Sequence, residues 1–88
     1  MEITEIKIFA VDEKRVKAYS SVVFDECFIV RDLKVIQGDS KLFVAMPSKK
    51  MKDGTYRDTV HPLNSNTRQW IESKVLEAYE HEVGSVSI

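Results

Sequence analysis

Apolar and polar side chains alternate along the first part of the chain with the period of two that is typical of β-strands. The alternating segments are residues 3–11, 16–24 and 27–36. In the third segment the pair Arg31-Asp32 interrupts the alternation and predicts a β-bulge. Short polar turns separate the segments, so they are predicted to pair in sequence as antiparallel strands.

Two further extended pieces follow. Residues 42–46 form a short, nearly all-apolar strand, and Pro47 ends its pairing on at least one side. Residues 47–55 are predicted to be a polar, basic loop that contains the turn dipeptide Asp53-Gly54. Residues 56–60 are predicted to form a fifth short extended piece.

The hydrophobic period then changes to that of a helix, predicted near residues 67–82. Asn66, with Gln69 three residues later, predicts a capping box at its start. Gly84 is a predicted helix stop, followed by a short tail over residues 84–88.

This order of elements predicts an α+β fold in a single domain over residues 1–88, with a mainly antiparallel sheet of four to five strands followed by one C-terminal helix. One helix covers only part of one sheet face. A second copy of the chain would cover the remaining apolar surface, so we expect a homodimer; the alternative is a small monomer with one solvated sheet face.

Composition indicates an ordinary folded protein: of 88 residues, 43% are hydrophobic and 31% are charged. No apolar run approaches the ~20 residues of a membrane span, so we expect no membrane association. The acidic, alternating start does not resemble a signal peptide, and Cys27 has no second cysteine with which to pair. We therefore expect a cytoplasmic protein.

Charge is uneven along the chain although the net charge is only -1. Residues 41–74 carry seven basic and three acidic side chains, whereas residues 75–88 carry three acidic and no basic ones. A role in nucleic-acid binding would therefore depend on a local basic surface.

The densest basic stretch lies in the predicted loop and contains the candidate nucleic-acid-binding residues Lys49, Lys50, Lys52 and Arg57. Long cationic side chains on a loop are suited to phosphate contacts. The alternative is a solvated turn whose lysines only maintain solubility.

Arg68 lies near the predicted helix start, where a guanidinium beside unpaired N–H groups would suit a phosphate. The alternative is an ion pair of Arg68 with Glu72 or Asp58. Trp70 has two interpretations, stacking on a base or packing at the core edge or a dimer contact, and packing is favoured.

No active site is evident. Asp58 and His61 lack a third metal ligand and a nearby nucleophile, so His61 is predicted to be structural at the corner before the helix. Cys27 follows an acidic turn, which disfavours the thiolate. We expect no catalytic residues, no metal and no cofactor. The alternative is a metal-dependent enzyme that uses Asp58 and His61.

Several segments resemble the stage V sporulation protein G family (SpoVG, or septation regulators) from residue 1 to about residue 82. These segments are 1–7 MEITEIK, 32–38 DLKVIQG, 42–50 LFVAMPSKK, Gly54, 57–58 RD, 61–64 HPLN and 67–68 TR.

The resemblance implies a cytoplasmic bacterial regulator, not an enzyme. Members are homodimers of a β-sheet and a C-terminal helix that bind DNA, in some cases RNA, and influence septation, sporulation or gene expression. The family regions associated with nucleic acid correspond to the basic loop and Arg68. Two departures stand out: Gln69-Trp70 replaces a further basic residue that often follows Thr-Arg, and many members have a longer tail.

With the resemblance, the favoured function is a dimeric nucleic-acid-binding regulator with strong salt dependence and modest sequence specificity. Asn66 and Gln69 are the candidate base-reading residues. No element evidently suited to the major groove is predicted. The alternative is a protein-interaction module that binds a division or regulatory partner through its sheet edges and acidic helix.

Overall fold

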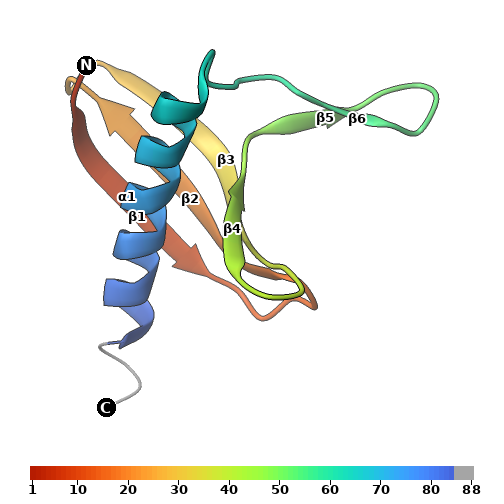
Figure 1. Cartoon of the computed structure of the whole chain (residues 1–88), viewed down its shortest axis with the longest axis horizontal. Coiled ribbons are helices and arrows are strands. Elements are labelled where there is room, and N and C mark those ends of the chain that lie inside the picture. Colours follow the sequence, from red (N-terminus) through yellow and green to blue (C-terminus); the bar gives the residue numbers. More distant parts are fainter. Residues whose placement is uncertain (85–88) are drawn as a thin grey trace.

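A computed structural model, which describes residues 1–84, contains a four-stranded antiparallel sheet in the order β1-β2-β3-β4 (Figure 1). The strands are β1 (Ile3–Ala10), β2 (Val16–Phe24), β3 (Phe28–Gln37) and β4 (Leu42–Ala45). Consecutive strands are neighbours because short turns connect them. In the β2–β3 turn, Asp25 and Glu26 both have positive φ angles, of 53° and 56°.

The helix α1 (Ser65–Gly84) lies across one face of the sheet (Figure 1). Its buried residues Ile71 and Val75 meet the inward-facing side chains of the strands and of the segment after β4. The buried core consists of Ala18, Val22, Phe24, Leu33, Val35, Val44, Met46, Ile71 and Val75. The predicted α+β fold, a sheet followed by one helix, is confirmed.

Three β-bulges shape the sheet. The predicted bulge in β3 is confirmed: Ser20 pairs with Leu33 but Val22 pairs with Val30, so β3 has one extra residue, and Asp32 has a φ angle of 67°. Other register shifts lie at the start of β1 and near Val16 in β2. Bulges bend strands and increase their twist, which lets a narrow sheet curve around a single helix.

The helix begins earlier than predicted, and its cap is a different residue. The Asn64 side chain accepts a hydrogen bond from the Thr67 backbone N–H at 2.8 Å, whereas Asn66 lies inside the first helical turn. The predicted capping box of Asn66 and Gln69 is therefore wrong, because a side chain that caps a helix must precede its first turn. The helix also continues to Gly84, beyond the predicted end; residues 85–88 of the predicted tail lie outside the described residues.

The predicted basic loop is instead half of a two-stranded antiparallel ribbon. Its strands are β5 (Ser48–Lys50) and β6 (Tyr56–Asp58), and they form a separate sheet from β1–β4 (Figure 1). The Thr59 N–H and hydroxyl both donate to the Pro47 carbonyl, at 2.8 and 3.2 Å, which closes the base of the ribbon. The extended piece predicted over residues 56–60 contains β6, whereas β5 lies within the predicted loop, because a strand of three polar residues shows no hydrophobic period.

The two edges of the main sheet differ. At the β4 edge, the Val44 N–H donates to the Glu72 carboxylate of α1 at 3.1 Å. Each edge strand has one strand neighbour, which is β2 for β1 and β3 for β4. Within residues 1–84, no helix is both long enough and apolar enough to cross a lipid bilayer.

Candidate nucleic-acid interface

The β5–β6 ribbon projects from the body of the protein (Figure 1). It brings together four of the basic residues that are predicted to bind nucleic acid. Lys49 pairs with Arg57 across the ribbon, Lys50 pairs with Tyr56, and Lys52 lies in the connecting turn. All five side chains are exposed. Because neighbouring residues of a strand point to opposite faces, Lys49 and Lys50 give each face of the ribbon a positive charge.

Hydrogen bonds fix the turn at the tip of the ribbon. The Asp53 carboxylate accepts from the Thr55 hydroxyl at 2.6 Å and from the Thr55 N–H at 3.0 Å. These bonds, the hydroxyl one first, lower the pKa of Asp53. Gly54 follows with a φ angle of 91°, a conformation that side chains disfavour. The tip is thus a defined turn, which fixes the backbone at Lys52.

The charges of the ribbon are available for a ligand. Within residues 1–84, Lys49, Lys50, Lys52 and Arg57 form no ion pair with the protein's own carboxylates. The lysines also border an open hollow of about 450 Å³ at the tip, together with Met51 and Asp53. Unpaired, solvated cations around a concave surface can exchange small counterions for phosphate groups.

Arg68 lies at the base of the ribbon, in the first turns of α1. Its guanidinium lies 3.7 Å from the Asp58 carboxylate of β6, and both side chains are a little over 40% exposed. Its own N–H donates to the Asn64 carbonyl at 3.2 Å. Of the two predicted ion-pair partners the structure selects Asp58, since Glu72 binds the β4 edge. Asn66 and Gln69 are exposed on the first turns of α1.

The structure also places the other candidate residues, Trp70, His61 and Cys27. Trp70 packs on Phe24 with ring centroids 6.2 Å apart and an angle of 52° between the planes, in line with the predicted packing role. His61 Nδ1 lies 3.0 Å from the Pro62 carbonyl. Within residues 1–84, no group of three or more potential metal-ligating side chains is found. Cys27 is exposed in the β2–β3 turn.

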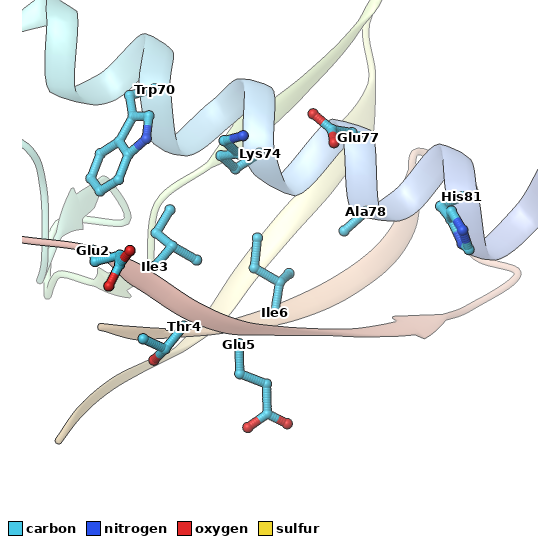
Figure 2. A pocket seen from close by; sticks show the side chains of 10 residues that line it. All are labelled: Glu2, Ile3, Thr4, Glu5, Ile6, Trp70, Lys74, Glu77, Ala78 and His81. Atoms are coloured by element: carbon cyan, nitrogen blue, oxygen red, sulfur yellow. The ribbon is translucent and has the colours of Figure 1, made fainter. Parts of the chain in front are cut away.

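A second surface, which the sequence analysis did not identify, is an open groove of about 570 Å³ between β1 and α1 (Figure 2). We call it the β1–α1 groove. It is lined by Glu2, Ile3, Thr4, Glu5, Ile6, Trp70, Lys74, Glu77, Ala78 and His81. The spacing of Trp70, Lys74 and Glu77 places them on one face of a helix, and this much can be read from the sequence. Only the fold shows that this face borders the β1 edge of the sheet.

Together these features define a small α+β protein with one helix on a bulged antiparallel sheet and a projecting cationic ribbon. The chain belongs to the SpoVG family, whose model matches residues 1–81.

Several curated proteins are similar over nearly the whole chain, and each bears the name "Putative septation protein SpoVG". The one from Bdellovibrio bacteriovorus is 62% identical over 86 residues, which is 98% of this chain and 80% of that protein. The one from Myxococcus xanthus is 51% identical over 83 residues, covering 94% and 84%. The one from Agathobacter rectalis is 48% identical over 87 residues, covering 98% and 100%.

Proposed function

We propose that this protein is a dimeric nucleic-acid-binding regulator that acts in septation or in gene expression. The observation that carries the proposal is the β5–β6 ribbon, which presents four exposed cations without carboxylate partners among residues 1–84. The septation role is supported by the name that similar proteins bear. Phosphate contact through the ribbon is the proposed binding mode.

The form of the ribbon favours DNA as the ligand. The B-DNA major groove is about 12 Å wide and admits a two-stranded β-ribbon, whereas the major groove of duplex RNA is too narrow for side chains to enter. No element suited to the major groove was predicted from the sequence, whereas the ribbon has the two-stranded form that this groove admits. The exposed amides of Asn66 and Gln69 stay candidate base-reading groups at the start of α1.

The salt dependence of binding tests the proposal. We would measure fluorescence anisotropy with a mixed-sequence DNA duplex and an RNA hairpin over a range of salt concentrations. Each lost phosphate contact lowers the slope of log affinity against log salt by about 0.9 on duplex DNA. A Lys49→Ala/Lys50→Ala variant removes one lysine from each ribbon face, so its slope should be shallower by about one to two units per protomer.

A matched control removes the same charge at the far end of the molecule. Lys14 and Lys41 are exposed and lie in the β1–β2 and β3–β4 connections, away from the ribbon (Figure 1). A Lys14→Ala/Lys41→Ala variant should keep the wild-type slope. Equal slopes for all three proteins would exclude the ribbon as the binding surface. No binding by wild type at low salt would favour the alternative, a module that binds a protein partner.

Arg68 needs its own test because it already has an anionic neighbour. If Arg68 contacts phosphate, Arg68→Ala should weaken binding, and Asp58→Asn should strengthen it by releasing the guanidinium. If Arg68 only anchors the ribbon, both variants should lower affinity to a similar degree.

A further inference from the structure

We propose that the β1 edge and the β1–α1 groove form a two-fold interface with the same surfaces of a second copy of this chain. This inference rests on the dimer in the proposed function and identifies the surface that forms it. In such a pair, β1 meets its counterpart antiparallel, and the facing sides of the two α1 helices fill each other's groove.

The first observation is the difference between the two sheet edges. Both β1 and β4 are edge strands, but at the β4 edge the Glu72 carboxylate of α1 accepts a hydrogen bond from the Val44 N–H. An uncovered edge strand is a template for pairing with another chain. Beside this edge lies the β1–α1 groove, with Ile3, Ile6, Trp70 and Ala78 as its apolar lining. Backbone groups and apolar surface are thus available at the same place.

The second observation is that β1 is complementary to itself. In a two-fold interface each residue pattern must match its own reversed copy. If the axis passes beside Ile6, Glu5 of each chain lies opposite Lys7 of the other chain. The strand pair then contains two such oppositely charged pairs. Glu5 and Lys7 share a sheet face, since their charged groups lie 3.9 Å apart, and Glu5 points away from α1 (Figure 2). Opposite charges therefore face each other across the new strand pair.

The third observation is the same symmetry on α1. The groove-lining residues Trp70, Lys74, Glu77 and His81 have a spacing that is unchanged when the helix direction is reversed. An axis midway between Lys74 and Glu77 places each of these two charges opposite its counterion in the partner. Within residues 1–84, neither Lys74 nor Glu77 forms an ion pair.

One axis serves both elements. Ile6, the centre of the strand pattern, lies below the helix segment that carries Lys74 and Glu77 (Figure 2). A single rotation therefore pairs β1 with β1 and α1 with α1. The two sheets then join through their β1 strands, and the two β5–β6 ribbons, which follow β4, project from the opposite outer edges. The interface leaves both ribbons exposed to nucleic acid.

Charge reversal at the helix centre tests this interface. Lys74→Glu places two pairs of glutamates across the axis, and Glu77→Lys places two pairs of lysines there. Each single variant should raise the dimer dissociation constant about tenfold or more, measured by sedimentation velocity, because facing like charges are strongly unfavourable at an interface. The double variant Lys74→Glu/Glu77→Lys restores both pairs and should dimerise as wild type does.

Mixing the two single variants adds a test that misfolding cannot imitate. A Lys74→Glu chain and a Glu77→Lys chain have complementary charges, so the mixture should form heterodimers at concentrations where each alone is monomeric. Glu80→Lys, an equal charge change at an exposed position outside the groove, is the control and should leave dimerisation unchanged.

The outcomes separate the interface from the proposed function. A wild-type dimer that both single reversals leave intact overturns this interface and keeps the proposed dimer. A wild-type protein that is monomeric at about 100 µM overturns both the interface and the proposed dimer. This concentration is on the order of 100 times the dissociation constant of a micromolar complex. In either case the salt titration of the ribbon variants decides nucleic-acid binding independently.

Discussion

Replacing Glu72 by alanine should destabilise the protein through the sheet edge that Glu72 covers. The Val44 N–H, on a residue that is 3% exposed, would lose its carboxylate acceptor at 3.1 Å. A hydrogen bond to a charged group contributes about 1.5–3 kcal/mol, and this one is only partly buried, so the low end applies. The better helix propensity of alanine offsets a few tenths of a kcal/mol. The net loss should be about 1 to 1.5 kcal/mol.

Thermal and urea unfolding followed by circular dichroism would measure this loss. For a domain of this size, 1 kcal/mol corresponds to a shift in Tm of about 4–8 °C. Glu72→Gln keeps an acceptor oxygen and should recover most of the stability. Glu80→Ala, at an exposed position on the same helix, controls for helix propensity. The reasoning is wrong if Glu72→Ala unfolds within about 0.3 kcal/mol of the Glu80 control, a difference typical of neutral surface changes, or if Gln is as destabilising as Ala.

Three further outcomes are expected. Because the folded turn lowers the pKa of Asp53, the Asp53 carboxylate contributes its full stabilisation above the ordinary pKa of 3.8 and loses it as the pH falls through the lower pKa of the folded state. The chemical shift of the Thr55 amide in an NMR pH titration would follow this protonation. Asp53→Asn should abolish the shift change. Gly38→Ala should lower Tm, since a Cβ would lie 2.9 Å from the Lys41 carbonyl oxygen. Val75→Ala, at a fully buried position, should cost about 2–3 kcal/mol in urea unfolding.

The long elements were predictable from the sequence because each has several residues over which a period can repeat. The three long strands and the helix follow from alternation and from helical spacing, and Arg31-Asp32 marked its bulge by breaking the pattern. The helix cap was misassigned because Asn64 and Asn66 are both good capping residues. Only the backbone shows which of them precedes the first turn.

The candidate site was predictable in composition and not in geometry. The cluster Lys49, Lys50 and Lys52 is visible as charge along the chain, but the pairing of Lys49 with Arg57 depends on a ladder of three residues. The Arg68–Asp58 contact was one of two local possibilities, and the position of Glu72 over β4 decided between them. The β1–α1 groove joins residues about 70 positions apart, which no local pattern reports.

The bulge at Asp32 also determines where the chain tolerates a change of length. Val30 and Leu33 face the same core although they are three residues apart, because Arg31 and Asp32 together stand opposite one residue of β2. Deleting one residue of this pair would leave a regular strand with every apolar side chain still on its own face. A deletion elsewhere inside β3 would exchange the two faces for all side chains on one side of the deletion, so that core residues there would turn to solvent. Among relatives of this protein, single-residue gaps within this strand are therefore expected at this position.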